Sequence, residues 1–165
     1  FGGQSLQSLL TDHHFSLQDC LSIAIRTAES LAQIHAAKII HKDLNPSNIV
    51  LNLTTGELKL IDFGLATKLS RENPTIRHPN VLEGTLAYLS PEQTGRMNRS
   101  VDYRTDLYSF GVTLYEMLTG RVPYEAETPL AVVLKHISAP LPLPRDVNPQ
   151  VPEAVELCRT AGSGR

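Results

Sequence analysis

The stretch HKDLNPSNIVLNLTTGELKLIDFG, residues 41–64, carries most of the information about the fold. It opens with the polar, non-periodic run HKDLNPSN and continues into two apolar runs, residues 49–53 and residues 57–61. A short polar turn with glycine, residues 54–56, separates these runs, and this pattern indicates a β-hairpin. We therefore predict a loop followed by a two-stranded hairpin, with Asp62 at the exit of the second strand.

Helical periodicity flanks this stretch on both sides. Apolar residues recur every three or four positions after Ser16, and Ser16 with Asp19 has the spacing of a capping box, which predicts a helix that runs to about Ala37. Residues 4–10 predict a short helix before it. Residues 106–119 are apolar nearly all round and end at Gly120, a good C-terminal cap, so we expect this helix to be buried at the centre.

The rest of the chain is less regular. Thr128-Pro129 predicts the start of a helix that reaches about Ser138. A proline-rich loop follows it, and a last short helix begins at Val151-Pro152 and loses its pattern after Cys158. Residues 62–92 have little periodicity, and a loop of that length inside a compact domain is usually functional or mobile.

Composition limits the classes of protein. A chain of 165 residues is one domain or one large lobe, and 41% hydrophobic with 19% charged residues is typical of a globular protein rather than a disordered one. Fifteen basic and seventeen acidic residues form no basic cluster, so nucleic-acid binding has no electrostatic support. No apolar run approaches a membrane span, and lone Cys20 and Cys158 favour a reducing cytosol over a disulfide framework. Because the chain starts at Phe1 without methionine, we expect a fragment.

Three polar residues are candidates for one site. Asp43 and Asn48 lie in the non-periodic loop, and Asp62 follows the second hairpin strand. Two groups on one loop and one at a neighbouring strand end can converge on a single point. Each alone is more simply a turn or capping residue, so the evidence for a site comes from their order along the chain.

That order resembles protein kinases of the serine/threonine type. Residues 41–48 resemble the catalytic loop H-R-D-L-x-x-x-N, residues 62–64 match D-F-G, and residues 90–92 resemble A-P-E. Gly84-Thr85 with Tyr88 resembles the stretch before A-P-E, and Asp106 matches the start of the helix that anchors the catalytic loop. The resemblance covers essentially the whole chain.

The resemblance implies an α+β fold: a kinase-like C-terminal lobe that is mainly helical, with a small β-hairpin next to the catalytic loop. The N-terminal lobe is expected to be absent, because no glycine-rich loop and no strand lysine for the phosphates is found in the sequence. Residues 1–165 are thus expected to be a partial kinase domain that starts just after the hinge and stops before its last helix.

Residue roles follow from the same resemblance. Asp43 would orient the attacking hydroxyl and accept its proton. Asn48 and Asp62 would bind Mg²⁺, which together with ATP is the implied cofactor. Val50 would form part of the apolar floor under the adenine ring, and Thr85 would hydrogen-bond near Asp43 and help to receive a serine or threonine.

Other residues of the motifs are expected to be structural. His41 should pack near Phe63 and not act as a base. Asp106 should hydrogen-bond the backbone of the catalytic loop, with a simple helix N-cap as the alternative. Three tyrosines are expected to pack in the core or at its rim: Tyr88, Tyr108 and Tyr115.

The sequence also departs from the family. Lys42 replaces an arginine that binds a phosphorylated activation loop, which puts such control in doubt although Thr67, Ser70 and Thr75 are available. Asn45 occupies the catalytic position where a lysine usually touches the transferring phosphate, so transition-state stabilisation should be weaker. The arginine that normally pairs with Glu92 is expected beyond the end of the chain.

We therefore expect a serine/threonine protein kinase fragment that transfers phosphate from ATP to protein hydroxyls and that is inactive by itself, because half of the ATP site is missing. The alternative is a pseudokinase-like module that regulates or docks other domains. The sequence of residues 84–120 resembles kinase domains at the front of large bacterial signalling proteins that continue into ATPase, sensor and histidine kinase domains. The expected partners are a protein substrate and those other domains, in the cytoplasm.

Overall fold

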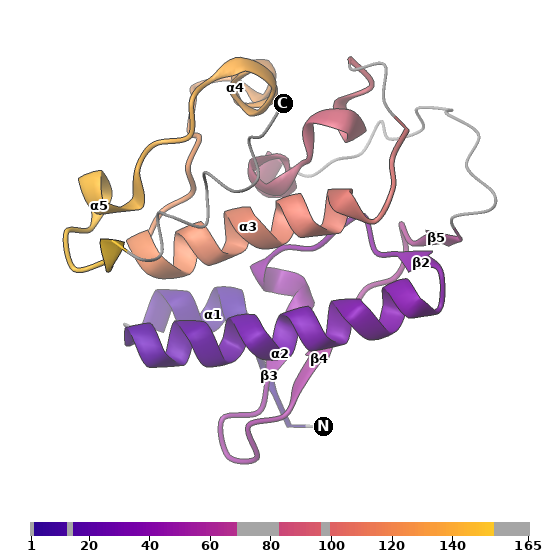
Figure 1. Cartoon of the computed structure of the whole chain (residues 1–165), viewed down its shortest axis with the longest axis vertical. Coiled ribbons are helices and arrows are strands. Elements are labelled where there is room, and N and C mark those ends of the chain that lie inside the picture. The colour runs from indigo at the N-terminus through magenta and orange to yellow at the C-terminus, as the bar shows by residue number, and fades with distance from the viewer. Residues whose placement is uncertain (1, 13–14, 69–82, 97–99, 154–165) are drawn as a thin grey trace.

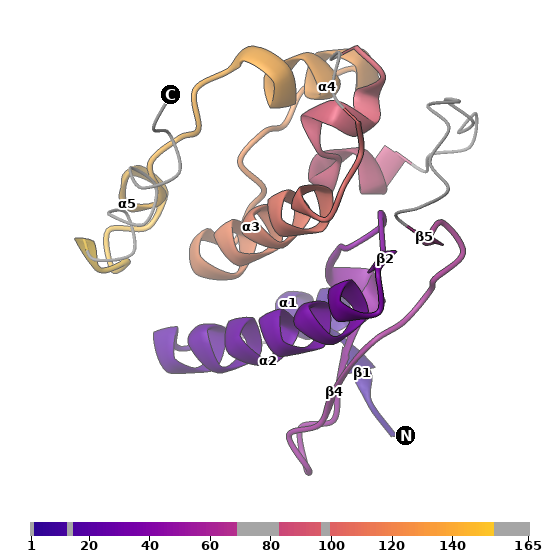
Figure 2. The same cartoon turned by 45° about the vertical axis from the view of Figure 1, so that its right-hand side comes forward.

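The structure is a computed structural model that describes residues 2–12, 15–68, 83–96 and 100–153. Two long helices, α2 (Leu17–Ala36) and α3 (Arg104–Thr119), lie side by side at its centre (Figure 1). A β-hairpin lies on the side of α2 away from α3, and Figure 2 shows the same order of layers from a second direction. The fold is α+β and mainly helical, as the sequence predicted.

Helix α2 begins where the capping box predicts. The Ser16 hydroxyl accepts a hydrogen bond from the Asp19 amide (3.2 Å), and the Asp19 carboxylate accepts one from the Ser16 amide (3.0 Å). These reciprocal bonds satisfy backbone donors that have no partner inside the helix. The helix ends at Ala36 and buries one face against the core, made of Cys20, Ile23, Ala24, Thr27 and Leu31.

The first sheet contains the predicted hairpin. Strands β3 (Ile49–Leu51) and β4 (Leu58–Leu60) pair in antiparallel fashion, and both are shorter than predicted. Strand β1 (Gln4–Ser5) pairs with β3, so the prediction of a helix over residues 4–10 was wrong for its first two residues. Helix α1 (Leu6–Asp12) begins directly after β1. Pairing with a distant strand overrides the local helical pattern at Gln4 and Ser5.

A second, two-stranded sheet pairs the strand before the candidate-site loop with a strand that follows Asp62. Strand β2 (Ile39–Ile40) comes immediately before the loop and pairs with β5 (Thr67–Lys68), which lies beyond Asp62. The loop itself ends in a 3-10 turn, η1 (Pro46–Asn48), that leads into β3. The two sheets therefore fix both the entrance to the loop and the segment after Asp62.

Helix α3 starts two residues before the predicted position and ends at Gly120 as predicted. Gly120 adopts a left-handed conformation (φ 78°), and its amide donates to the Glu116 carbonyl (2.7 Å). The expectation that α3 is buried all round was wrong in part, because the side chain of Leu107 is 48% exposed. The core between α2, α3 and the hairpin is formed by Leu6, Leu9, Cys20, Ile23, Leu31, Leu44, Ile49, Leu51, Met117, Leu118 and Val151.

The remaining elements surround α3. Helix α4 (Pro129–Ser138) contacts two 3-10 turns, η3 (Glu83–Tyr88) and η4 (Pro91–Thr94), and both η3 and α5 (Pro144–Val147) contact α3. Helix α4 has the predicted bounds, whereas α5 lies in the proline-rich segment predicted as a loop. The last predicted helix falls mostly, and Cys158, Ser70 and Thr75 fall wholly, outside the described residues. Within the described part of the chain, no helix has the length and apolar character needed to span a bilayer.

Asp106 connects helix α3 to the loop. Its carboxylate is fully buried and accepts the backbone amides of His41 (2.9 Å) and Lys42 (2.8 Å). The ring of His35 on α2 lies 2.8 Å from the same carboxylate. The helix N-cap is Tyr103, so the N-cap alternative for Asp106 was wrong and the predicted bond to the loop backbone is confirmed. One carboxylate thus joins α2, α3 and the loop.

Replacing Asp106 by asparagine should lower the free energy of unfolding by about 2–4 kcal/mol. Asparagine has a single acceptor oxygen, so its NH₂ group would face one of the two buried backbone donors. Denaturant titration of the variant measures the loss. The control is Asp102→Asn, which breaks an exposed ion pair with Arg104 (2.7 Å) and should cost less than about 1 kcal/mol. Equal losses in the two variants would contradict the anchoring role.

Replacing two glycines, one inside α3 and one at its C-cap, by alanine should change the free energy of unfolding in opposite directions. Gly111 lies inside the helix and Gly120 is its left-handed cap, and an added Cβ would meet no neighbouring atom within 4 Å at either position. Gly111→Ala should stabilise the chain by roughly 0.5–1 kcal/mol through helix propensity. Gly120→Ala should destabilise it by about 1 kcal/mol through the left-handed backbone. Unfolding midpoints that shift in the same direction would contradict this assignment.

Candidate active site

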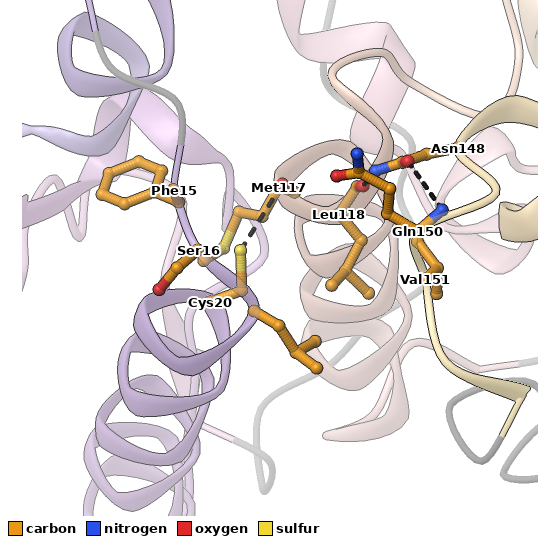
Figure 3. Close-up of a pocket in the computed structure, with 9 residues that line it drawn as sticks. Phe15, Ser16, Cys20, Met117, Leu118, Asn148, Gln150 and Val151 are labelled. Carbon is orange, nitrogen blue, oxygen red and sulfur yellow. Dashed lines mark hydrogen bonds between the residues drawn. The ribbon is translucent and has the colours of Figure 1, made fainter.

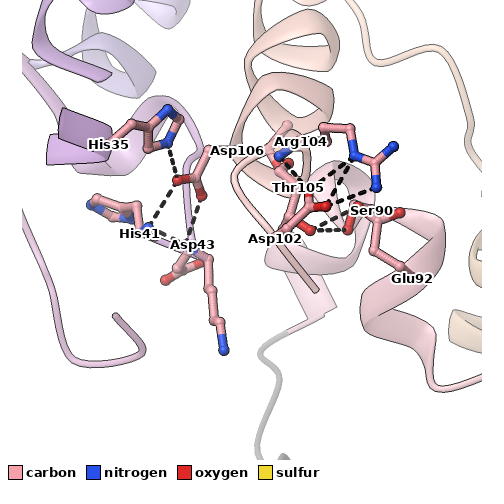
Figure 4. Close-up of polar contacts among 11 residues, drawn as sticks. His35, His41, Asp43, Ser90, Glu92, Asp102, Arg104, Thr105 and Asp106 are labelled. Carbon is pink, nitrogen blue, oxygen red and sulfur yellow. Dashed lines mark hydrogen bonds and ion pairs between the residues drawn. The ribbon is translucent and has the colours of Figure 1, made fainter. Parts of the chain in front are cut away.

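The loop that carries Asp43 is held in a strained conformation. Lys42 has a positive φ of 68°, which is uncommon for a residue with a side chain, and its amide is one of the two that donate to Asp106. Figure 4 shows Asp106 beside His35 and His41, with Asp43 following on the loop. Backbone strain of this kind persists only where the surroundings enforce it, and it clusters at functional sites.

Asp43 is held by two side-chain amides. The NH₂ group of Asn45 donates to Oδ1 of Asp43 (3.1 Å), and the NH₂ group of Asn48 donates to Oδ2 (3.1 Å). Both amides also donate to the Asp43 carbonyl, at 3.1 and 2.8 Å. The carboxylate therefore has one amide donor on each oxygen and a defined orientation.

The electrostatic environment of Asp43 has opposing contributions. Burial raises its pKa above the ordinary value, and the negative charge of Asp62 adds to that rise. The hydrogen bonds from Asn48 and Asn45 oppose the rise. An aspartate with a raised pKa is a better proton acceptor than an exposed one, which suits a group that orients a hydroxyl and takes its proton.

His41 is structural, as predicted. Its ring is fully buried, and Nε2 lies 3.0 Å from the Ile61 carbonyl, an acceptor, so this nitrogen carries the proton. The other nitrogen, Nδ1, accepts the Asp43 amide (3.4 Å). The ring also packs against Phe63, tilted by 53° with 4.7 Å between centroids. Both ring nitrogens are thus engaged, and His41 is not available as a general base.

Asp62 and Asn48 are the predicted metal ligands. Asp62 is exposed and has a left-handed backbone (φ 60°), and its Oδ1 accepts the Gly64 amide (3.2 Å). Asn48 is buried, and its amide nitrogen faces Asp43, which directs its oxygen away. Among the residues that the structure describes, no group of three or more histidine, cysteine or acidic side chains gathers as a metal site. A cation held here would therefore take one carboxylate and one amide from the chain.

The other two predicted site residues lie in β3 and η3. Val50 lies at the centre of β3, paired with Lys59 on one side and with Ser5 on the other. Thr85 lies in η3, and none of the hydrogen bonds between described residues joins its side chain to Asp43. The predicted roles of Val50 under adenine and of Thr85 in receiving the substrate stay predictions.

Sequence reasoning missed a contact between the segment at residues 90–94 and the loop. The side chain of Gln93 donates to the Lys42 carbonyl (2.7 Å) and accepts the Ser90 hydroxyl (3.0 Å). Glu92, whose arginine partner was expected beyond the end of the chain, accepts the Thr105 hydroxyl of α3 (2.7 Å). Figure 4 shows Ser90, Glu92 and Thr105 together at the start of α3. The glutamine directly after the S-P-E motif is the signal that could have indicated this contact.

The three tyrosines pack as expected, and two have polar partners: Tyr88 bonds Glu116, and the Tyr108 hydroxyl lies 2.7 Å from Nδ1 of His136. Tyr88 and Tyr115 are buried, and Tyr108 is half-buried. The Tyr88 hydroxyl donates to the Glu116 carboxylate (2.6 Å). Burial, and then this bond, raises the pKa of Tyr88, and burial also raises the pKa of Glu116. The pair joins the segment before residue 90 to the middle of α3.

A pocket lies at the other end of α3 (Figure 3). Its volume is about 140 Å³, and it is lined by the start of α2, the end of α3 and the segment around Gln150. Cys20 points into it, and the thiol contacts the Met117 carbonyl at 3.5 Å. None of the predicted site residues lines this pocket, so it is separate from the candidate active site.

Comparison with known proteins identifies the family of the chain. The protein kinase domain family matches residues 1–158. A probable serine/threonine-protein kinase of Clostridium perfringens is 41% identical over 135 residues, which cover 82% of this chain and 19% of that protein. The serine/threonine-protein kinase PrkC of Bacillus subtilis is 37% identical over 139 residues, 84% of this chain and 21% of that protein.

A probable serine/threonine-protein kinase of Clostridium acetobutylicum is 39% identical over 154 residues, 93% of this chain and 23% of that protein. The chain thus spans about a fifth of the length of the curated relatives it matches. The family match covers nearly the whole chain, and the loop, the hairpin and the helix α3 carry its motifs in the family's order. The chain therefore belongs to the protein kinase domain family.

Proposed function

We propose that this chain carries the catalytic loop of a serine/threonine protein kinase that transfers the γ-phosphoryl group of ATP to a protein hydroxyl. The observation that supports this most is the clamp on Asp43, in which each carboxylate oxygen receives one side-chain amide. Asp62 lies close enough for its charge to act on Asp43. The relatives named serine/threonine-protein kinases support the class of acceptor.

In this proposal Asp43 orients the acceptor hydroxyl and receives its proton. The hydroxyl oxygen forms a bond to the γ-phosphorus, and the bond from that phosphorus to the β–γ bridging oxygen breaks, which leaves ADP. The proton of the hydroxyl passes to the Asp43 carboxylate. The raised pKa of Asp43, caused by burial, favours this acceptance. Because phosphoryl transfer depends mainly on positioning, a rigid Asp43 is the chief contribution of the loop.

The donor set suits Mg²⁺, which prefers hard oxygen ligands and keeps several waters. Asn48 would offer its amide oxygen, because its nitrogen is committed to Asp43, and Asp62 would offer an exposed carboxylate. When bound, Mg²⁺ neutralises charge on the phosphates of ATP. We assign Val50 to the apolar floor of the adenine site and Thr85 to the acceptor side, as the family resemblance implies.

We also propose that residues 1–165 form the lobe that carries the catalytic loop and that this piece alone transfers no useful amount of phosphate. The sequence has no glycine-rich loop and no strand lysine to hold the phosphates. Its partners would be a protein substrate and further domains of a larger signalling chain in the cytoplasm. The second candidate is a regulatory, pseudokinase-like module, which is favoured by the uncharged Asn45 at the position of a phosphate-contacting lysine.

Asp43→Asn in the longer protein that carries this chain should reduce phosphate transfer by roughly 10²–10⁴-fold, because the proton acceptor is lost. Radiolabelled transfer from Mg-ATP to a general protein substrate measures the change. Asp102→Asn, at the exposed pair with Arg104, is the control and should keep its activity. If the parent protein is folded, binds Mg-ATP and transfers nothing, the regulatory module is the better function.

Asp62→Asn should raise the Mg²⁺ concentration needed for half-maximal transfer by roughly 10- to 100-fold, because a neutral amide is a poorer ligand than a carboxylate. A Mg²⁺ titration at saturating ATP measures this shift. The matched control is Asp12→Asn, an exposed aspartate at the end of α1. An unchanged Mg²⁺ requirement in Asp62→Asn would remove Asp62 from the metal site.

A further inference from the structure

Asn45 has an unusual place in the loop. It is the N-cap of η1, and its side-chain oxygen accepts the Ser47 amide (2.9 Å). Only 6% of the residue is exposed. The bond from the Ser47 amide to the Asn45 oxygen is therefore a local cap of the short turn η1. The other half of the side chain, the NH₂ group, points back to Asp43 and makes the two bonds described above.

The hydrogen-bonding capacity of the Asn45 amide is therefore largely committed. An asparagine side chain has two N–H donors and one carbonyl oxygen. Here the NH₂ group serves the carbonyl and the carboxylate of Asp43, and the oxygen serves Ser47. A buried amide engaged in this way presents no donor to a phosphate group outside the loop.

We propose that Asn45 is a positioning residue for Asp43 and makes no contact with the transferring phosphate. It fixes Oδ1 of the carboxylate while Asn48 fixes Oδ2, so rotation of the carboxylate costs a charge-assisted hydrogen bond on either side. The kinetic consequence rests on the proposed phosphoryl transfer. The arrangement of the clamp itself does not, and it can be tested without any activity.

A purely structural cap is the competing explanation, and the chain contains a natural example of one. Asn52 in the hairpin turn accepts the amides of Thr54 (3.0 Å) and Thr55 (3.1 Å) through its side-chain oxygen. No described hydrogen bond joins Asn52 to a carboxylate. Substitutions at Asn52 therefore show how the loss or retention of a cap changes stability and kcat when the capping residue has no bond to a carboxylate.

The kinetic test uses Asn45→Asp and Asn45→Ala in the longer protein, with Asn52→Asp and Asn52→Ala as matched controls. Asn45→Asp keeps an acceptor for Ser47 but loses the donor to Asp43, whereas Asn45→Ala loses both. We expect kcat to fall roughly 10- to 100-fold in both Asn45 variants, the effect of one hydrogen bond to a charged group. In Asn45→Ala the KM for ATP should stay unchanged, and the Asn52 variants should keep the kcat of the parent.

A third variant, Asn45→Lys, keeps a donor for Asp43 and loses the acceptor for Ser47, which is the reverse of Asn45→Asp. A lysine supplies a donor that can reach the Asp43 carboxylate but no acceptor for the Ser47 amide. We expect its unfolding midpoint to stay below that of the parent, because the Ser47 amide loses its acceptor; its kcat does not test the proposal, because a lysine at this position can also contact the transferring phosphate. Asn45→Asp with the kcat of the parent would overturn the proposal in favour of a cap. A raised KM for ATP in Asn45→Ala at constant kcat would overturn it in favour of a ground-state contact with ATP. Loss of a contact with the transferring phosphate would lower kcat, so the NMR measurement below distinguishes that contact from the clamp.

An NMR measurement on the 165-residue chain tests the clamp if the parent protein transfers no phosphate. The side-chain NH₂ protons of Asn45 and Asn48 should exchange slowly with solvent, and Asp43→Ala should accelerate both. The NH₂ protons of Asn52 should be insensitive to that substitution. Exchange at Asn45 that is unaffected by Asp43→Ala would show that the hydrogen bond is absent and would overturn the proposal, whatever the outcome of the activity assay.

Discussion

The buried carboxylate of Asp106 is the interaction on which the candidate site depends. It receives two consecutive backbone amides, those of His41 and Lys42, and thereby holds Lys42 in a left-handed conformation. That conformation turns the chain so that Asp43 faces Asn45 and Asn48. A charge in the interior is tolerated only when its hydrogen bonds are complete, and the two amides with the ring of His35 complete them.

Around this anchor, the loop is fixed from several sides by weak and ordinary contacts. Strands β2 and β5 pair across its two flanks, the ring of His41 bonds the carbonyl of the residue after β4, and Gln93 reaches the Lys42 carbonyl. Each contact alone contributes little to stability. Together they restrict the loop to one conformation, which suits a reaction that depends on placing a hydroxyl and a phosphate rather than on a covalent intermediate.

Local features of the fold could be predicted from the sequence, and features that depend on distant pairing could not. The capping box at Ser16, the turn before Gly56 and the cap at Gly120 are set by neighbouring residues, so they were found. Strand β1 has two residues and no periodicity of its own, and it exists because β3 lies beside it. The donor role of Asn45 was missed for a related reason. From the sequence alone, an asparagine at that position indicates only that a lysine has been replaced. The folded loop is needed to show that its NH₂ group faces Asp43.

The anchor also has a consequence for the order in which the protein is built. Asp106 lies 64 positions after Lys42 in the chain, so the loop is translated long before the residue that shapes it. At about 5–20 residues per second, a ribosome needs roughly 3–13 s to cover that distance. During this interval the loop lacks the carboxylate that anchors it. Any chaperone that protects the emerging chain would therefore act before the loop is anchored, and release would be productive only after α3 has left the exit tunnel.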